Sequence, residues 1–486
     1  MFSFHTDYPL LQDKADAALA GLQANIRTLS PFPKPVLIEG GNYQGIWLES
    51  GPLEGLLYAD VNPEIALNNH RAFFALQEDD GYLPCFIWNK KVGRSQIQMV
   101  VPIAATALEL YKKTGDENFL EQAFSSCSRW ELWLEKFRDT RQTGLCEAFC
   151  EYDTGHDKSP RWDGVPRKCR DDDARLCPEV TGLPYLSPDL SATIYGGRIA
   201  LAGMAKILGY REKTEYWTAK AETVKKALFE CCFDDESLCF YDLDVDGKFN
   251  RIACDLLTRV LSEHVVNQSL FEQIYNFWIV NPKAFWTPFP FPSVAINDPR
   301  FVQELPDNSW GGPSQVLTAL RAPRWLEYYG KYAKLTELMH IWIEALINSN
   351  GFMQQMNPFT GKLSCSDGYS PAMCLLIDFI KRLYGISIQD QEIEWNCRCP
   401  NQQNSSYKTE YKTLDLEIIN QKNQSHIVID GINHISIAGE CRFVTDFAGN
   451  PKAFIGTSTE QQIIKLKTRH KTCEYQLAVD QKMNLT

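Results

Sequence analysis

One short stretch of the chain concentrates the residue types that acid–base chemistry requires. Residues 151–163 read Glu-Tyr-Asp-Thr-Gly-His-Asp-Lys-Ser-Pro-Arg-Trp-Asp, and Gly155 and Pro160 oppose a regular helix or strand there. Cleavage of a glycosidic bond needs a carboxylic acid to protonate the leaving oxygen, a group that delivers the nucleophile, and aromatics that hold the sugar. The loop offers the acid and the aromatic, although a solvated acidic loop with an internal Asp–Arg pair has a similar composition.

The overall composition is that of a globular protein without a basic surface. The 486 residues are 44% hydrophobic and 23% charged, with a formal net charge of −12. This charge argues against nucleic acid, an anionic polysaccharide or an acidic membrane as partner, because few cations are free to neutralise phosphates. A small neutral carbohydrate fits better. The aromatic fraction of 12% suits stacking on sugars, and it suits a thick core equally well.

The N-terminus and the cysteines predict a cytoplasmic protein. Residues 1–7 have no basic region followed by an apolar run, so no signal peptide is expected, and no apolar run of about 18 residues predicts a membrane span. Sixteen cysteines without an export signal indicate reduced thiols. Because no paired CxxC motifs occur and the histidines are scattered, neither a metal site nor a cofactor is expected. The sequence carries no signal for the oligomeric state.

Residues 1–388 repeat a helix–turn–helix pattern. Apolar positions up to Tyr111 are followed by Gly115, which ends a helix, and by Asp116, which can cap the next one. The same pattern recurs around Gly209 and Gly330. Consecutive helices joined by short turns tend to be antiparallel neighbours. The pattern predicts a mainly α fold, in which about a dozen helices form an α/α toroid with its site at one rim.

The periodicity changes after residue 388. Short alternating or β-branched segments occupy residues 414–418, 427–429, 435–437 and 463–466, between turns rich in Asn, Gly and Lys. Residues 389–486 are therefore predicted to form a small C-terminal β-sandwich that packs on the toroid.

The acidic loop also resembles a known motif. Residues 155–163, Gly-His-Asp-Lys-Ser-Pro-Arg-Trp-Asp, are similar to the Gly-x-Asp-x-Ser-Pro-x-Trp-Asp loop of (α/α)6 glycoside hydrolases. The hydrolases in question are related to trehalase, glucosidase I and the mannosylglycerate or glucosylglycerate hydrolases. The resemblance implies an (α/α)6 toroid with Asp157 as the general acid, and a sugar subsite that includes Trp162 and Asp163.

Other residues of the loop are candidates for supporting this acid and for binding substrate. Asp153 and Asp163 are carboxylates whose charge could raise the pKa of Asp157. His156 is expected to form hydrogen bonds rather than to ligate a metal. Arg161 is expected to pair with Asp157 or Asp163, or to point into the site.

Further segments extend the resemblance from about residue 40 to 385. Trp47 and Glu49 lie in Ile-Trp-Leu-Glu-Ser, which resembles a Trp-x-Trp-Asp-Ser segment that binds sugar hydroxyls. Gln96 lies in Ser-Gln-Ile-Gln, where the family has a Ser-Gln-Pro-Pro-like turn that binds sugar. Trp310 lies in Ser-Trp-Gly-Gly-Pro, similar to Tyr-Trp-Arg-Gly-Pro, with Gly311 in place of the arginine. The resemblance implies that these residues hold the sugar.

The main departure from the family is Gln354. Residues 354–361 read Gln-Gln-Met-Asn-Pro-Phe-Thr-Gly and resemble Glu-x-Tyr-Asn-Pro-x-Thr-Gly, whose glutamate is the family's general base. An amide has no basic lone pair near neutral pH, so Gln354 can position a water but cannot deprotonate it. Another carboxylate could replace it, and Asp367, Glu304 and Asp307 are the candidates.

Three functions stay open at this point. The main prediction is an inverting, exo-acting glycosidase for a small neutral, α-linked glycoside or oligosaccharide, whose two carboxyl groups lie roughly 6.5–9.5 Å apart. An inverting phosphorylase would need only the acid, with phosphate held by a cation such as Arg161, Arg94 or Lys362. A catalytically silent sugar-binding protein would need no base.

Overall fold

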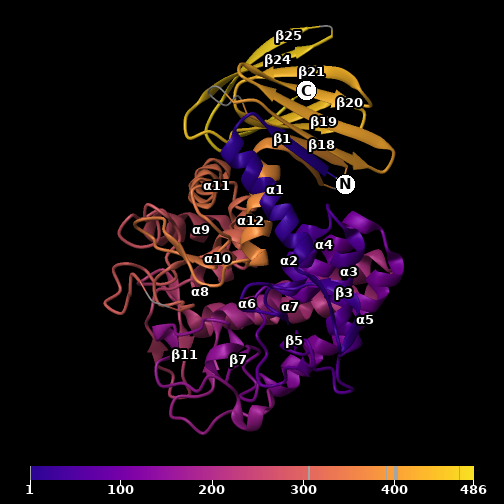
Figure 1. Cartoon of the computed structure of the whole chain (residues 1–486). Coiled ribbons are helices and arrows are strands. Elements are labelled where there is room, and N and C mark those ends of the chain that lie inside the picture. Colours follow the sequence, from indigo (N-terminus) through magenta and orange to yellow (C-terminus); the bar gives the residue numbers. More distant parts are fainter. Residues whose placement is uncertain (1, 305–306, 390, 399–402, 470, 486) are drawn as a thin grey trace. The chain divides into compact units, whose positions relative to one another are not determined.

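The computed structural model describes residues 2–304, 307–389, 391–398, 403–469 and 471–485. The chain is mainly helical up to Tyr384 and strand-rich after it, as the sequence predicts (Figure 1). The helices are α1 (Pro9–Ala24), α2 (Gly51–Tyr58), α3 (Pro63–Ala75), α4 (Ile103–Thr114), α5 (Glu117–Phe137), α6 (Pro188–Ile207), α7 (Arg211–Cys232), α8 (Leu256–Ser262), α9 (Gln268–Ile274), α10 (Val316–Leu326), α11 (Tyr332–Ile347) and α12 (Ser370–Tyr384).

The chain divides into two compact units. The helical unit comprises Leu22–Arg321 and Phe352–Ala372, and the sheet unit comprises Met1–Gly21, Ala322–Gly351 and Met373–Thr486. Short strands interrupt the helical unit: β2 (Ile26–Leu29), β3 (Phe32–Leu37), β4 (Gly45–Trp47), β5 (Phe86–Trp88), β6 (Lys91–Val92), β7 (Glu147–Ala148), β8 (Tyr185–Leu186), β9 (Phe233–Asp234), β10 (Cys239–Phe240), β11 (Asp242–Leu243), β12 (Phe249–Asn250), β13 (Ser314–Gln315), β14 (Gln355–Met356) and β15 (Leu363–Ser364).

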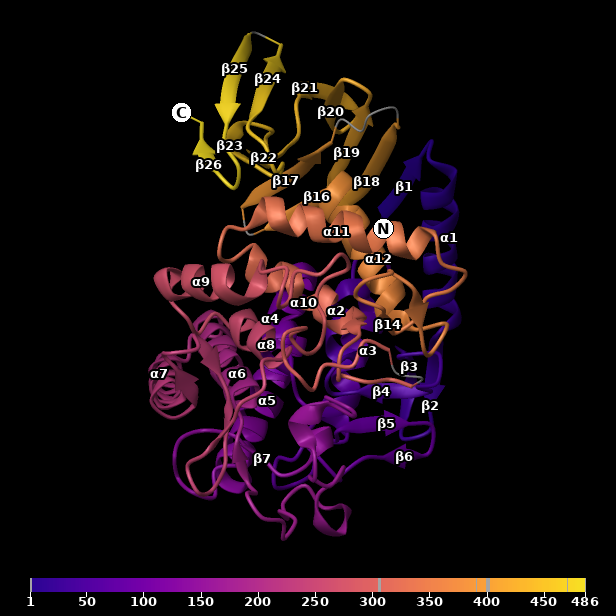
Figure 2. The same cartoon turned by 90° about the vertical axis from the view of Figure 1, so that its left-hand side faces the viewer.

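Helix pairs build the helical unit. Helix α2 packs on α3, α4 on α5 and α6 on α7, and the first members α2, α4, α6 and α8 contact one another in turn (Figure 2). Helix α6 is buried on nearly every side, whereas α7 buries one face. A Cβ atom at Gly196 or Gly197 of α6 would lie within 2.6 Å of a neighbouring glutamate oxygen, so glycine allows this close packing.

The turns between paired helices follow the predicted chemistry. Gly115 ends α4 in the left-handed conformation, with φ +67°, and its N–H donates to the carbonyl of Tyr111. The side chain of Asp116 accepts a hydrogen bond from the N–H of Phe119 and caps α5. The sequence therefore specified this helical hairpin locally.

Two antiparallel sheets dominate the sheet unit. One has the strand order β1-β18-β19-β20-β21-β24-β25 and the other has the order β16-β17-β22-β23-β26. Strands β16 and β17 contact β18, β19 and β20, so the two sheets pack on each other. Their strands are β1 (Phe2–Thr6), β16 (Ile386–Gln389), β17 (Glu392–Cys397), β18 (Ser405–Tyr411), β19 (Leu414–Gln421), β20 (Gln424–Ile429), β21 (Ile432–Ala438), β22 (Cys441–Asp446), β23 (Pro451–Ile455), β24 (Gln462–Thr468), β25 (Thr472–Leu477) and β26 (Lys482–Asn484).

The larger sheet contains both predicted and unpredicted strands. In β19, Leu416 and Ile418 are buried at alternate positions, which is the period-2 pattern read from the sequence. Strand β1 was not predicted, because five residues at the far end of the chain carry no local signal for their partner. It pairs antiparallel with β18, with Phe4 opposite Tyr407.

A carboxylate shared by two arginines ties helices to a strand within the sheet unit. Glu327, directly after α10, binds Arg382 of α12 and Arg442 of β22, both at 2.8 Å. Burial raises the pKa of Glu327, but the two guanidinium groups outweigh burial and lower the pKa to about 2. Its contribution to stability is therefore present above the unfolded pKa and is lost as pH falls toward 2.

Removing this carboxylate should destabilise the fold. We expect Glu327→Gln to lower the free energy of unfolding at pH 7 by roughly 2–4 kcal/mol, since two largely buried arginines each lose one of their two carboxylate partners. Glu440→Gln is the control, because its bond to Arg398 is more exposed and should contribute less than about 1 kcal/mol. Urea denaturation measures both, and equal effects would contradict the assignment.

Candidate active site

A fully buried guanidinium holds the acidic loop in place. Arg161 donates to both oxygens of Asp189 and to both oxygens of Asp242, at 2.7–2.9 Å. Asp189 lies in the first turn of α6, and Asp242 begins β11. The guanidinium is saturated by these partners, so it pairs neither with Asp157 nor with Asp163. The sequence could not show this, because the two partners come from elements remote from the loop.

A second buried network lies beside the first. The Nδ1 atom of His156 faces a donor of Arg161 at 3.1 Å and must accept, which leaves the Nε2 proton facing Asp255 at 3.4 Å. Arg259 of α8 donates to Asp255 and to the carbonyl of Thr154. Burial and the charge of Arg259 lower the pKa of His156 to about 3. His156 therefore stays neutral and connects the loop to α8 by hydrogen bonds, as expected.

Glu49, which lies just before the first residue of α2, reaches this loop. It is buried and accepts from Arg321 at 2.9 Å, with Arg259 at 3.8 Å. At Gly155, where φ is +65°, a Cβ atom would lie 2.1 Å from a Glu49 carboxylate oxygen. Glycine is required at this position both by the backbone conformation and by the close approach of Glu49.

Asp157 is the partly exposed acid of the loop. Its carbonyl accepts from the N–H of Trp310 at 2.9 Å, and its Oδ2 accepts from the amide of Asn308 at 3.0 Å. Burial, followed by the charges of Glu49 and Glu151, raises the pKa of Asp157 to about 7. A carboxyl group with this pKa holds a proton near neutral pH and can donate it.

Asp153 and Asp163 do not provide the charge that the sequence analysis assigned to them. Asp153 is fully buried. Its carboxylate accepts hydrogen bonds from Arg138, at 2.5 and 3.0 Å, and from backbone N–H groups such as that of Ile97. Asp163 is exposed. The charges of Glu49 and Glu151 raise the pKa of Asp157 instead, because the fold brings Glu49 to the loop.

The same Asp153 takes part in the group of side chains nearest to a metal-site arrangement. Its carboxylate lies within 4.8 Å of the thiols of Cys150 and Cys169, all buried. Arg138, which also contacts Cys169, places a fixed positive charge against this group. These residues therefore do not suit a cation.

The tryptophans divide into buried and accessible ones. Trp162 donates to Thr154 and is 3% exposed, and Trp310 is 2% exposed between His156 and Arg259. Neither ring offers a face to a sugar in this structure, because the loop and α8 cover them. Both instead stabilise the loop that carries Asp157.

Trp47 offers the accessible aromatic surface. It is partly exposed and lies 5.4–6.0 Å from the rings of Tyr43, Phe86 and Trp88. Trp88 is 41% exposed. Its only signal in the sequence is an aromatic residue in a short strand, which does not distinguish it from other tryptophans. By contrast, the predicted Gln96 is buried, and its side chain bonds to Ser95 and Gln98.

Gln354 and Asn308, the partner of Asp157, face the same tyrosine, Tyr43. Gln354 directly precedes β14, the middle strand of the β13-β14-β15 sheet. Its Oε1 accepts a hydrogen bond from the Tyr43 hydroxyl at 3.1 Å. Asn308, the partner of Asp157, also faces that hydroxyl. The predicted acid and the position of the family's base thus lie on one site, together with Tyr43 and Asn308, which sequence patterns did not indicate.

The three candidate bases are exposed and have local partners. Asp367 accepts from the N–H groups of Phe352 and Gly368. Asp307 pairs with Lys158, and Glu304 accepts from Asn357.

Another carboxylate, Glu39, is buried at the same site, where the charge of Asp157 acts on it. The signal for it was the apolar run Val-Leu-Ile that leads directly into a glutamate before two glycines.

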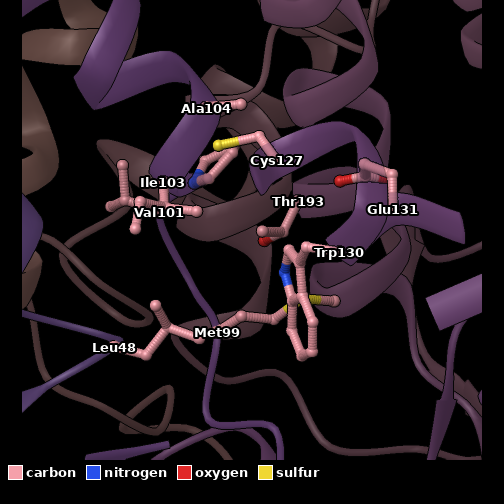
Figure 3. Close-up of a pocket in the computed structure, with 10 residues that line it drawn as sticks. Leu48, Met99, Val101, Ile103, Ala104, Cys127, Trp130, Glu131 and Thr193 are labelled. Atoms are coloured by element: carbon pink, nitrogen blue, oxygen red, sulfur yellow. The ribbon is translucent and has the colours of Figure 1, made fainter. Parts of the chain in front are cut away.

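A small cavity lies elsewhere among the inner helices (Figure 3). It encloses ≈ 10 Å³, about the space of one water molecule. Its lining includes Leu48, Met99, Trp130 and Thr193, and no residue of the 151–163 loop. It is therefore too small for a sugar and takes no part in the site.

The family model for the mannosylglycerate hydrolase MGH1-like glycoside hydrolase domain matches residues 53–370, which include the acidic loop and Gln354. The chain belongs to this family. It is accordingly a glycosidase, and it is related to the (α/α)6 enzymes trehalase and mannosylglycerate hydrolase.

Solved structures show the shared fold. GH63 mannosylglycerate hydrolase from Thermus thermophilus, in complex with Tris and D-glycerate, aligns with a TM-score of 0.61 and 20% identity over 76% of this chain and 100% of that one. Neutral trehalase from Saccharomyces cerevisiae aligns with a TM-score of 0.55 and 15% identity over 71% and 73% of the two chains.

A curated relative of this glycosidase comes from Borreliella burgdorferi. That uncharacterised protein is 20% identical over 269 residues, which are 53% of this chain and 50% of the relative. The alignment therefore spans about half the length of the relative.

Gly155 offers a test of how closely the loop and Glu49 must approach. We expect Gly155→Ala to lower kcat/KM by about 10- to 100-fold, because the methyl group displaces the carboxylate beside the acid. Gly164→Ala is the control: φ is +81° there, and nothing lies within 4 Å of its added Cβ. It should cost about 1 kcal/mol of stability and leave kcat/KM unchanged. Equal kinetic losses would argue against a special role for the contact with Glu49.

The pKa of Asp157 predicts an alkaline limit to activity. The carboxyl group is protonated below about pH 7, so kcat/KM for a natural glycoside should fall about tenfold per pH unit above it. A glycosyl fluoride needs no protonated leaving group and should lack this decline. An identical decline with both substrates would assign it to another group.

Proposed function

We propose that this glycosidase cleaves a short neutral glycoside with inversion, and that Asp157 is its general acid. The observation that carries the proposal is the raised pKa of Asp157, caused by burial and by Glu49 and Glu151, at the position that matches the family's acid. Asn308 holds the carboxyl group without neutralising it. The proton that Asp157 donates goes to the leaving oxygen as the glycosidic bond breaks.

The surroundings of the acid support a neutral substrate. The charges of Glu49 and Glu151 act on Asp157, and they disfavour an anionic group at the cleavage point. Trp47 and Trp88 provide rings on which a sugar can stack. A solved relative in complex with glucose is consistent with a small saccharide. Exo action and an α-linkage complete the proposal.

The finer architecture belongs to the same proposal. The inner helices α2, α4, α6 and α8 contact one another in turn, and α3, α5 and α7 pack on the first three of them. This arrangement supports an (α/α)6 toroid over residues 1–388. Residues 389–486 would then be the β-sandwich domain. Within the described part of the chain, no helix has the length and hydropathy needed to cross a membrane. The cysteines described there are free thiols, which supports a cytoplasmic location.

Phosphorolysis is the second candidate, favoured only by Gln354. It needs a cation that can bind phosphate near Asp157. Arg161 is buried and saturated by two aspartates, and Arg94 is paired with Glu78. Lys362 is exposed. Hydrolysis is therefore the function that the geometry supports best.

A panel of disaccharides and aryl glycosides, with and without inorganic phosphate, tests the proposal. We expect free sugar of inverted configuration at a rate independent of phosphate. Asp157→Asn should lower kcat on an alkyl glycoside by about 10²- to 10⁴-fold. It should retain most activity on a glycosyl fluoride. Sugar phosphate that forms only with phosphate would establish the phosphorylase. Sugar binding without any product would establish a silent protein.

A further inference from the structure

Glu39 is held rigidly at the end of the segment that follows β3. Its N–H donates to the carbonyl of Gly45 at 2.9 Å, and its carbonyl accepts from the N–H of Ser370 at 2.7 Å. Gly40 and Gly41 follow with φ of +78° and +56°. A Cβ at Gly40 would lie 2.4 Å from a backbone oxygen, so the tight turn after Glu39 requires glycine.

The carboxylate of Glu39 differs from its buried neighbours in its partners. It is 7% exposed, and Oε1 accepts from the hydroxyl of Tyr369 at 2.8 Å. In the part of the chain that the structure describes, no lysine or arginine forms an ion pair with it. Glu49, Asp189 and Asp153, by contrast, are each bound by an arginine.

Glu39 lies at the same site as Asp157. The ring of Tyr369, its partner, is 6.0 Å from the ring of Tyr43. Tyr43 in turn binds Gln354 and faces Asn308, the partner of Asp157. Burial raises the pKa of Glu39 well above its usual value, and the charges of Glu54, Glu49 and Asp157 add to this effect.

We propose that Glu39 is the general base of this glycosidase and takes the role that Gln354 cannot fill. The inference rests on the proposed function, in which Asp157 is the acid. A water molecule gives one proton to Glu39 while its oxygen bonds to the anomeric carbon. The glycosidic carbon–oxygen bond breaks with its electron pair, and the leaving oxygen takes the proton of Asp157. The two carboxyl groups exchange their protonation states, and release of products restores them through solvent.

The exposed candidates lack the features that this role needs. Asp307 has a side chain that is 69% exposed and paired with Lys158. Asp367 is exposed, and its carboxylate already accepts two backbone N–H groups. Of these three carboxylates, Glu39 is the one that is buried and that lies at the site of Asp157.

Glu39→Gln tests the inference, because glutamine keeps the shape and removes the base. We expect kcat on both a natural glycoside and a glycosyl fluoride to fall by about 10²- to 10⁴-fold. Added azide should restore turnover and form a glycosyl azide of inverted configuration, since azide needs no proton removed. Asp157→Asn, by comparison, should retain activity on the fluoride.

Three further variants separate catalysis from folding. Asp367→Asn and Asp307→Asn should keep kcat within about threefold of wild type, with thermal unfolding as a check. Glu39→Asp keeps a carboxylate and should retain part of kcat without azide. This variant tests the assignment even if Glu39→Gln does not fold.

The outcomes distinguish the two proposals. If the wild-type protein turns over no glycoside, the proposed function fails. If the wild type is active and Glu39→Gln keeps its kcat, the assignment of Glu39 fails while the function stands. A folded, sugar-binding Glu39→Gln that azide does not rescue would also overturn it, and so would loss of turnover in Asp367→Asn or Asp307→Asn.

Discussion

The arrangement of this site depends on the pairing of buried charges. A charge removed from water is costly unless a counter-charge and hydrogen bonds replace the water. Arg161 meets this condition with Asp189 and Asp242, and Arg138 meets it with Asp153. Each arginine joins the 151–163 loop to a different part of the helical unit. The loop therefore has one conformation without belonging to any long helix or strand.

The same principle explains which carboxylates are left for chemistry. Where arginine binds a carboxylate, the ionised form is stabilised and proton transfer is disfavoured, as at Asp189, whose pKa is held well below its usual range despite burial. Partly exposed Asp157 and buried Glu39 lie among further carboxylates and form no ion pair with an arginine, and their pKa values rise. The raised pKa suits Asp157 to hold a proton near neutral pH and to donate it.

Aromatic residues show a comparable division between support and function. Trp162 and Trp310 carry the family resemblance, yet they are buried against Arg161, His156 and Arg259. Their flat rings cover the guanidinium groups and exclude water from the ion pairs. Trp47 and Trp88 instead keep surface available to a ligand. Residue type alone does not distinguish the two uses, because exposure depends on which neighbours the fold supplies.

The sequence by itself determined the local features. The hairpin at Gly115 and Asp116, the alternation in β19, and the motif that carries Asp157 depend on residues close together in the chain, where propensity and motif are sufficient. Only the tertiary structure decided the partners: β1 joins β18 across about 400 residues, Arg161 finds Asp242, and Glu39 lies at the same site as Asp157. Such pairings depend on packing and on the burial of charge, which arise only when distant segments meet.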